Sequence, residues 1–536
     1  MNQQTLTQTT ITNSRATLQT QGSSQGSSRV LFQLPSQVPS QVPSHVQLSI
    51  PLSGQHAVIH KTLLINPPTG LFIREDRCQT PIQGQGVPIK RAPMDLAYMA
   101  AMLEQINIDC RLIDYPVEGG DYATFEEHFK EFMPDLLIMS VTSTTLPKDL
   151  LCAEIAKRIS PAVVTVAKGA DFFQSDKRTI ETYPAVDIVI RGEYEFAIQE
   201  LGKGNDWGSI LGITYRGKDG LPVRNKERRL LEKLDVLPFP SRHLMKNHLY
   251  PRPDTGTPTA VILTQRGCPA DCVYCLVSAV SGKKIHFRSP ESVAAEIEEC
   301  VYKHGIRDFF FRADTFTWYK PWVIKLCQLI IQKKLEITWV CNSRVDTIDD
   351  ERLEWMSRAG CWLIAFGVES GDQELLDNMK KRIKVEQSKT AIAACKRHGV
   401  KTYMFFVLGL PWESKESAER TIKFAQELDG DFVDFSIAFP FPGTELYDIV
   451  KENQLMRDKD VYGYSYDDPV THTFHLTNRE LVELKRKALM SFYLRPSYIA
   501  RTVWNNRSPK ILANYIKYGI QQMTYFMKLS PAKMEA

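Results

Sequence analysis

The chain has 536 residues, of which 43% are hydrophobic and 24% are charged, with a formal net charge of +4. This length exceeds what one hydrophobic core serves and predicts roughly two to four domains, while the small net charge gives no whole-chain field for nucleic acid. There is no run of about 18 apolar residues that could span a membrane, and the first residues lack the apolar segment of a secretory signal.

The amino-acid composition of the chain changes near residue 56. Residues 1–55 are rich in Gln, Ser, Thr and Pro and are predicted to be a disordered tail, because they cannot bury enough apolar surface to fold. Short β-branched runs then alternate with amphipathic patterns, which predicts parallel βαβ units in a doubly wound, Rossmann-like domain over residues 56–205. The expected strands are 61–68, 109–115, 134–143, 162–169 and 186–196, the last running into a helix, and the expected helices are 94–107 and 146–160.

A second alternating series follows a predicted linker at residues 206–250. Its expected strands are 259–267, 308–316, 337–345, 362–370, 401–409 and 432–440. Six βα repeats in this length predict a partial TIM-like (β/α)6 barrel over residues 251–465 rather than a closed eightfold barrel. Ser289 as N-cap, Pro290 and Gly305 predict the ends of one of its helices.

Residues 466–536 are predicted to be a helical C-terminal region in which Lys and Arg outnumber Asp and Glu. A solvated helical cap on the barrel is the favoured interpretation. Contact with a membrane surface or with an anionic substrate stays open.

Three cysteines cluster, whereas Cys152, Cys327 and others sit singly in apolar runs typical of buried residues in a reducing cytoplasm. The segment TQRGCPADCVYC places Cys268, Cys272 and Cys275 at C-x3-C-x2-C spacing just beyond the first barrel strand. Three thiolates can each hold one iron of a cubane cluster and leave one iron open. Tetrahedral zinc normally requires a fourth protein ligand, so zinc and a chance spacing are the less favoured alternatives.

The motif C-x3-C-x-aromatic-C, with Tyr274 as the aromatic, resembles that of the radical S-adenosylmethionine (SAM) enzymes over roughly residues 255–450. The resemblance implies a 4Fe–4S cluster whose open iron binds SAM, reductive cleavage of SAM, and a radical that abstracts hydrogen from a substrate. It also implies SAM contacts at successive strand ends, at Tyr274, Asp314, Thr315, Ser343, Arg344, Glu369, Ser370, Leu408, Gly409 and Leu410.

Within this resemblance each residue has an implied role. Asp314 and Thr315 face the cofactor's amino group, Arg344 pairs with its carboxylate, Ser343 and Glu369 bond the ribose, and the backbone of 408–410 meets the adenine. Taken alone, Arg344 could instead pair with Asp346, Glu369 could cap a helix, and Asp314 could be a turn residue.

The upstream domain resembles the cobalamin-binding domain of cobalamin-dependent radical enzymes, including radical SAM methylases and tetrapyrrole cyclases. Residues at its strand ends are the implied corrin contacts, namely Pro68, Thr69, Ser140, Thr142, Ser143, Thr144, Gly169, Ala170, Gly192 and Glu193. Two features depart from the pattern. The D-x-H-x-x-G motif that supplies a histidine to cobalt is absent, and AKGADFF replaces a glycine-pair turn. A degenerate domain that binds no cobalamin is therefore an open alternative.

The expected function is modification of an unactivated carbon of a metabolite, with methylation ahead of cyclisation or another rearrangement. A non-catalytic tetrapyrrole- or nucleotide-binding protein and a zinc-dependent nucleic-acid binder are the alternatives from other classes. The expected partners are a small-molecule substrate (lipid, polyketide, tetrapyrrole or peptide) and an electron donor such as flavodoxin or ferredoxin, with no nucleic acid.

Overall fold

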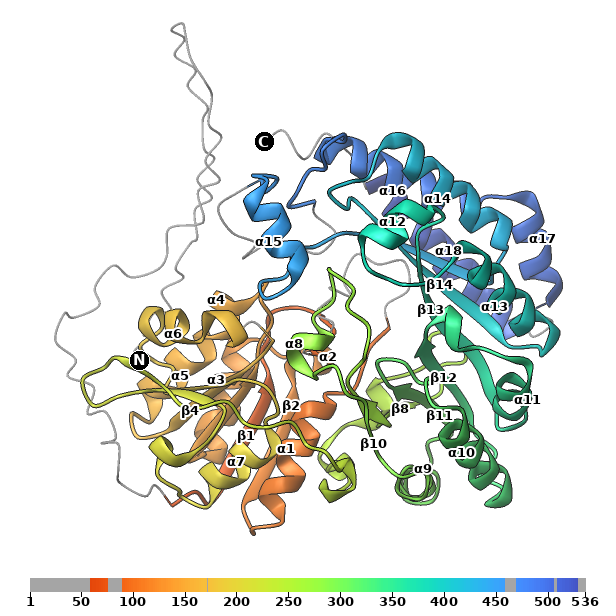
Figure 1. Ribbon diagram of the computed structural model, residues 1–536. Coiled ribbons are helices and arrows are strands. Elements are labelled where there is room, and N and C mark those ends of the chain that lie inside the picture. The colour runs from red at the N-terminus through yellow and green to blue at the C-terminus, as the bar shows by residue number, and fades with distance from the viewer. Residues whose placement is uncertain (1–57, 76–88, 171, 458–468, 506–508, 529–536) are drawn as a thin grey trace, which may run out of the picture. The chain divides into compact units, whose positions relative to one another are not determined.

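The computed structural model describes residues 58–75, 89–170, 172–457, 469–505 and 509–528 (Figure 1). These residues all lie within one unit of the chain, Leu48–Ala532. The predicted disordered tail, residues 1–55, lies outside the described residues.

The first sheet has seven strands in the order β2-β1-β3-β4-β5-β6-β7, and the strands from β1 to β5 pair in parallel. Its predicted members are confirmed as β1 Lys61–Asn66, β2 Asp109–Asp114, β3 Leu136–Ser140, β4 Val164–Lys168 and β5 Ile188–Ile190. Their side chains are almost all buried, as expected for strands covered on both faces.

Helices cover both faces of this sheet, so the predicted doubly wound architecture is confirmed. One core joins the sheet to α1 and α7, and another joins it to α3, α5 and α6. The helices are α1 Met94–Glu104, α2 Tyr115–Glu118, α3 Tyr122–Phe132, α4 Leu146–Asp149, α5 Leu151–Ile159, α6 Phe172–Thr182 and α7 Glu195–Gly202.

The predicted domain end at residue 205 is too early. The sheet continues through β6 Ile213–Arg216 and β7 Pro222–Arg224, which pair antiparallel within the predicted linker. A tight turn joins them, with Gly217 N–H donating to the Leu221 carbonyl at 2.8 Å. The rest of residues 206–250 consists of short 3₁₀ turns and connecting segments, η1 Trp207–Ser209, η2 Leu234–Val236, η3 Arg242–Leu244 and η4 Asn247–Leu249.

The second sheet has six parallel strands in the order β15-β14-β13-β12-β11-β8, with β8 and β15 at its two edges. The predicted open (β/α)6 barrel is therefore confirmed. The strands are β8 Thr259–Leu263, β11 Asp308–Arg312, β12 Thr338–Ser343, β13 Cys361–Glu369, β14 Lys401–Leu408 and β15 Phe432–Ile437. A small antiparallel pair, β9 Gln265–Arg266 and β10 His286–Phe287, follows the first strand.

The barrel helices alternate with these strands. They are α8 Val277–Val280, α9 Pro290–His304, α10 Lys320–Gln332, α11 Asp350–Arg358, α12 Gln373–Asn378, α13 Val385–Arg397, α14 Lys415–Leu428 and α15 Glu445–Glu452, with η5 Val345–Thr347 after β12. The ends of α9 are as predicted. The Ser289 hydroxyl accepts from Ser292 N–H at 3.1 Å, and Gly305 ends the helix in the left-handed region.

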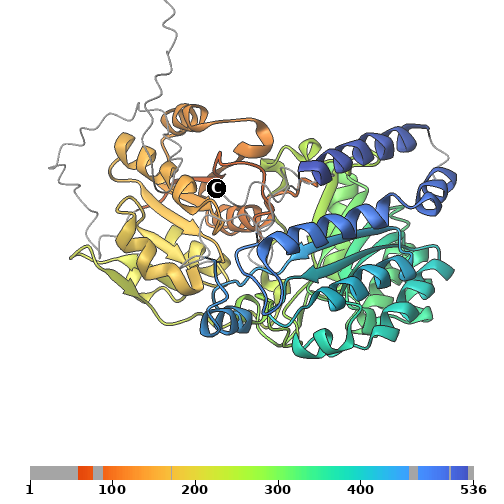
Figure 2. The same cartoon turned by 90° about the horizontal axis from the view of Figure 1, so that it is seen from above.

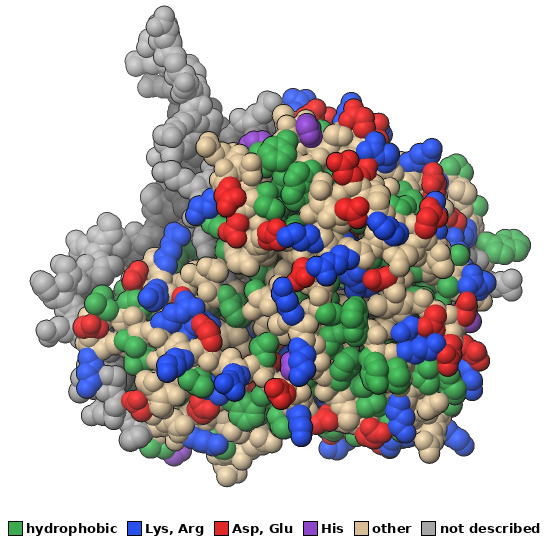
Figure 3. Space-filling view, in the orientation of Figure 1, with side chains coloured by type: hydrophobic (Ala, Val, Ile, Leu, Met, Phe, Trp, Pro, Cys, Tyr) green, Lys and Arg blue, Asp and Glu red, His purple; other side chains and the backbone are tan. Residues whose placement is uncertain are grey.

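From Asn478 onward the described chain is mainly helical, as predicted, in α16 Asn478–Tyr493, α17 Pro496–Asn505 and α18 Pro509–Lys528 (Figure 2). Helix α16 packs on β15, where the Tyr493 hydroxyl donates to the Val433 carbonyl at 2.6 Å. None of the helices in the described ranges has the length and apolar character needed to cross a membrane. Acidic and basic side chains are interspersed over the face in Figure 3.

Buried ion pairs join the doubly wound domain to the barrel. The Asp95 carboxylate on α1 accepts from Arg312 Nη1 of β11 and from the Tyr194 hydroxyl, both at 2.7 Å, and from Lys168 Nζ. Burial alone would raise the pKa of Asp95, but Arg312 and Lys168 outweigh it and hold that pKa well below its usual range. A second link runs from Arg266 to Glu193 at 2.9 Å and to Glu195. Arg266 lies two residues before Cys268, so this link fixes the start of the cysteine loop.

Candidate active site

The cysteine loop leaves the end of β9 through a backbone conformation that only glycine adopts easily. Gly267 has φ of +93°, and a Cβ there would overlap the Lys284 carbonyl oxygen. Its N–H donates to Asp314 Oδ2 at 2.8 Å. A carboxylate from the next strand end therefore braces the start of the loop.

The three clustered thiols differ from the other described cysteines. Cys268, Cys272 and Cys275 are free and partly exposed, whereas the described cysteines elsewhere in the chain are buried. Cys272 and Cys275 line a cavity of about 400 Å³. Nowhere in the described ranges do three His, Cys, Asp or Glu side chains converge on one metal ion. Three free thiols on one short loop can each ligate one iron of a cubane cluster.

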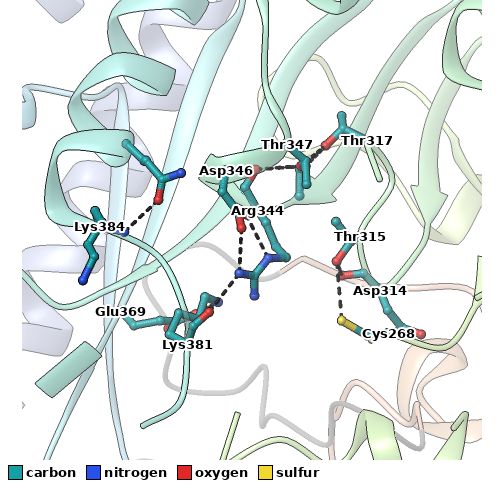
Figure 4. Close-up of polar contacts among 12 residues, drawn as sticks. Cys268, Asp314, Thr315, Thr317, Arg344, Asp346, Thr347, Glu369, Lys381 and Lys384 are labelled. Carbon is teal, nitrogen blue, oxygen red and sulfur yellow. Dashed lines mark hydrogen bonds and ion pairs between the residues drawn. The ribbon is translucent and has the colours of Figure 1, made fainter. Parts of the chain in front are cut away.

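Asp314 and Thr315 lie beside the cysteine loop, while their contact with the cofactor's amino group stays a prediction. The Thr315 hydroxyl is 3.8 Å from Cys268 Sγ and donates to the Asp314 carbonyl at 2.9 Å (Figure 4). The Asp314 carboxylate holds the Gly267 N–H, so it positions the loop in addition to any contact with a cofactor.

Arg344 has a partner within the chain. Its Nε and Nη2 each donate to the Asp346 carboxylate at 2.9 Å, and Nη2 also donates to the Lys381 carbonyl at 2.9 Å (Figure 4). The alternative that Arg344 pairs with Asp346 is confirmed, so the guanidinium fork is engaged in this structure. The hydroxyl of the preceding residue, Ser343, bonds the hydroxyl of Thr317.

Glu369 ends β13 at a register shift and has φ of +67°. Its Oε1 accepts from Lys381 Nζ at 2.6 Å, and Nζ is 3.5 Å from the Tyr274 hydroxyl. Glu369 therefore does not cap a helix. Ser370 turns away instead, since its hydroxyl bonds Thr421 at 2.8 Å and accepts from Asp372 N–H at 3.0 Å. Lys381 was not predicted, because no motif or regular spacing in the sequence links it to Glu369.

The turn after β14, from Leu408 to Leu410, is held by a buried glutamate that the sequence also did not reveal. Gly409 has φ of +85°, and its N–H donates to the carboxylate of Glu413. Glu413 is fully buried, and its Oε1 has no hydrogen-bond partner among the residues that the structure describes. Burial raises the pKa of Glu413 from 4.5 to about 8. The backbone predicted to meet adenine thus depends on this carboxyl group.

Protonation of Glu413 makes a testable contribution to stability. The pKa of Glu413 is raised from 4.5 to about 8 in the folded protein, so the folded state holds this proton more tightly than the unfolded chain does. The resulting stability is fully present below about pH 4.5 and is lost as the pH rises through about 8. A shift of that size corresponds to roughly 4–5 kcal/mol at most. Glu413→Gln is therefore expected to match the wild-type unfolding midpoint near about pH 5 and exceed it near about pH 9. The control is Glu427→Gln on the exposed face of α14, and equal pH profiles for all three proteins would contradict the assignment.

The strand ends of the doubly wound domain bring several predicted corrin residues around one buried ion pair. Arg74 Nη1 donates to Asp149 at 2.9 Å and to the Ser140 carbonyl at 2.8 Å. The Thr69 hydroxyl and the Thr142 N–H also donate to Asp149, the latter at 3.1 Å. Other predicted residues share these two loops, namely Pro68, Ser143 and Thr144. Arg74 and Asp149 were not predicted.

Of the remaining predicted corrin residues, Ala170, Gly192 and Glu193 lie near the start of the barrel. A Cβ on Gly169 would come within 2.8 Å of the Val141 carbonyl oxygen, so the loops after β3 and β4 approach closely there. Ala170 packs with Leu276 and Val280 beside the cysteine loop. Gly192 has φ of +76°, and the adjacent Glu193 carboxylate is engaged with Arg266 and the Leu231 N–H. This edge of the sheet therefore meets the cysteine loop directly.

Comparison with known families and structures agrees with this arrangement. Residues 262–425 match the model of the radical SAM superfamily, and residues 90–202 match that of the B12 binding domain. The chain is 34% identical to an uncharacterised methyltransferase of Pyrococcus horikoshii over 84% of this chain and 95% of that protein. It is 24% identical to an anaerobic magnesium-protoporphyrin IX monomethyl ester cyclase of Rubrivivax gelatinosus, over 81% and 80% of the two chains.

Two solved structures share the fold. OxsB, a cobalamin-dependent SAM radical enzyme, aligns with a TM-score of 0.66 at 15% identity over 90% of this chain and 72% of that one. The radical SAM methyltransferase TsrM from Kitasatospora setae aligns with a TM-score of 0.61 at 18% identity over 75% and 79%. Taken with the thiol loop and the two sheets, these matches show that the chain belongs to the radical SAM superfamily and carries a B12 binding domain.

Proposed function

We propose that this chain is a cobalamin-dependent radical SAM methyltransferase that modifies an unactivated carbon of a small molecule. The observation that carries the proposal is the position of the cysteine loop. It presents free Cys268, Cys272 and Cys275, and the helix after it packs on Ala170 at the edge predicted for the corrin. The site of SAM cleavage and the corrin that supplies the methyl group would then lie next to each other.

When bound at these sites, a 4Fe–4S cluster would supply the electron for cleavage of SAM, and a corrin would supply the methyl group. The chain's own residues hold and orient these groups. The three thiolates would ligate iron, Asp314 fixes the loop through the Gly267 N–H, and Glu413 fixes the adenine-side turn through the Gly409 N–H. For the corrin, the threonines around Asp149 offer hydroxyl groups at the sheet edge.

Carbon-centred ring formation is the second candidate, favoured by similarity to magnesium-protoporphyrin IX monomethyl ester cyclases. The two candidates differ in their use of SAM. Methyl transfer consumes a second SAM to restore the methyl group and therefore releases S-adenosylhomocysteine, whereas cyclisation needs only the cleaved SAM.

We also propose an electron-donor partner and a cytoplasmic location. Reductive cleavage needs an external electron donor, such as flavodoxin or ferredoxin, and the free described thiols are compatible with a reducing cytoplasm. Contact of the C-terminal helices with a membrane surface, an alternative that the sequence leaves open, is supported by apolar side chains exposed on α17 and α18, including Trp504, Ile516 and Ile520. We propose that the substrate is a lipid, a polyketide or a tetrapyrrole.

The test is an anaerobic reaction of the reconstituted protein with reductant and SAM, with and without added cobalamin. We expect 5′-deoxyadenosine in both cases and S-adenosylhomocysteine only when cobalamin is bound, at up to one equivalent per corrin, because each reduced corrin accepts one methyl group from SAM when no acceptor substrate is present. The control replaces Asp149 by Ala to disturb the predicted corrin edge while sparing the cysteine loop. Deoxyadenosine without any cobalamin-dependent S-adenosylhomocysteine would reject methyl transfer and leave cyclisation.

A further inference from the structure

The last two helices of the described chain expose large apolar side chains. On α18, Ile516, Ile520 and Met523 follow one another at spacings of four and three residues, which places them on one face of the helix. These three side chains, called here the apolar stripe, are 45–61% exposed. On α17, Val503 is 52% and Trp504 is 76% exposed. Exposed apolar groups that gather in this way mark contact with a partner or a membrane.

The other face of α18 is already occupied by the barrel. Asn514 Nδ2 donates to the Asp254 carbonyl at 2.7 Å, and the Tyr515 ring stacks on the ring of Phe432. At about 100° per residue, Asn514 and Tyr515 point roughly half a turn away from the apolar stripe. The helix is therefore held by one face, and the contacts that hold it leave the stripe exposed.

The same contacts place both helices at one particular end of the barrel. Asp254 precedes β8, and Phe432 begins β15. On α17, the Tyr498 hydroxyl donates to the carbonyl of Asp431, just before β15, at 2.9 Å. These positions are at the N-terminal ends of parallel strands, whereas the cysteine loop and Asp314 follow C-terminal ends. Helices α17 and α18 are therefore attached at the end of the barrel away from the candidate active site.

Charge favours an anionic surface as the partner of these helices. Residues 496–528, which contain both of them, include five Lys or Arg and no Asp or Glu. Lys517 is exposed and adjoins Ile516 of the stripe. A bilayer with acidic lipids offers an apolar layer together with negative headgroups, and basic amphipathic helices bind such surfaces. A second copy of this chain would instead bring the same cations together across a symmetric contact.

We infer that the exposed faces of α17 and α18 bind the surface of a bilayer that contains anionic lipids. The apolar stripe and Trp504 enter the headgroup layer, and Lys517 pairs with lipid phosphate. This inference rests on the membrane contact in the proposed function, to which it adds the lipid charge, the contacting residues and the orientation. Because the bilayer meets the N-terminal end of the barrel, the candidate active site faces away from it. The contact therefore attaches the chain and is not the entry path of a lipid substrate.

The first test is co-sedimentation of the full reconstituted chain with vesicles of phosphatidylcholine, alone or mixed with phosphatidylglycerol. We expect binding to the mixed vesicles that weakens as salt is raised, and little binding to phosphatidylcholine alone. Ile516→Ser combined with Ile520→Ser should weaken binding by roughly tenfold or more, because the apolar contact is lost. Lys517→Glu should weaken it several-fold by reversing one charge. Leu221→Ser is the matched control, because Leu221 is 60% exposed but belongs to the doubly wound domain.

The second test determines the orientation from tryptophan fluorescence, using mixed vesicles whose acyl chains carry bromine. Bromine quenches the tryptophans that enter the bilayer, so Trp504→Phe is expected to abolish the quenching. Trp318 is 41% exposed and follows β11 at the C-terminal end of the barrel strands. Quenching that persists in Trp504→Phe and disappears in Trp318→Phe would show that the active-site end faces the lipid, and it would overturn the orientation.

The binding results decide the rest of the inference. No binding of the wild type to the mixed vesicles would overturn it, as would equal binding of the wild type and the Ile516→Ser, Ile520→Ser variant. A lipid-free dimer that this variant abolishes would assign the stripe to self-association instead. Circular dichroism checks folding, and Lys517→Glu carries the test if the double variant does not fold. SAM cleavage is assayed without vesicles, so a wild type that cleaves no SAM rejects the proposed function, whereas one that binds no vesicles rejects this inference.

Discussion

Cys272→Ala is expected to abolish both the iron–sulfur absorbance near about 400 nm and the cleavage of SAM. The remaining thiols, Cys268 and Cys275, would leave a second iron of a cubane without a protein ligand. Loss of activity should therefore be complete rather than graded, and iron content should fall together with 5′-deoxyadenosine formation.

The matched control for this variant is Cys327→Ala, because Cys327 is buried on α10 away from the loop. It should keep its cluster and its cleavage activity, with at most a small loss of stability. Cleavage of SAM by Cys272→Ala at the wild-type rate would end the assignment of the loop as the cluster site.

Asp95→Ala is expected to destabilise the protein by about 3–5 kcal/mol, because it leaves two buried cations, Lys168 and Arg312, without their shared carboxylate. Lys168 belongs to the doubly wound domain and Arg312 to the barrel, so removal of the Asp95 carboxylate should also weaken the contact between the two domains. We expect the urea unfolding transition, monitored by tryptophan fluorescence, to move to a lower urea concentration and to separate into two steps.

The control for this prediction is Asp109→Ala, an exposed carboxylate at the start of β2. Its unfolding curve should stay close to that of the wild type, as for most surface substitutions. If Asp95→Ala unfolds at the same midpoint as Asp109→Ala, the buried network contributes nothing measurable and does not join the two domains.

Much of the fold could be predicted because its signals are local. Buried parallel strands read as continuous apolar runs such as residues 136–140, and caps such as Ser289 and Gly305 mark helix ends within a few residues. The cysteine loop was predicted for the same reason, since all three thiols lie within eight residues, Cys268 to Cys275. The β6–β7 hairpin was missed although GKDG between its strands is a turn signal, because β7 is short and largely exposed.

The parts of the site that escaped prediction are pairs of charges far apart in sequence. Asp149 meets Arg74 across 75 positions, and neither residue has a neighbour that signals the other. Lys381 reaches Glu369 only because a bulge and two left-handed residues turn it inward. Tertiary contacts of this kind depend on backbone geometry, and a single sequence does not encode them in a readable pattern.

A cubane on three thiolates with one iron left for SAM is tested most directly by Mössbauer spectroscopy of protein reconstituted with ⁵⁷Fe. Adding SAM should change the spectrum of one iron in four and leave the others as they were, because only the iron without a cysteine ligand can accept the cofactor. Zinc or no inorganic sulfide in anaerobically prepared protein, or four irons that ignore SAM, would contradict the account.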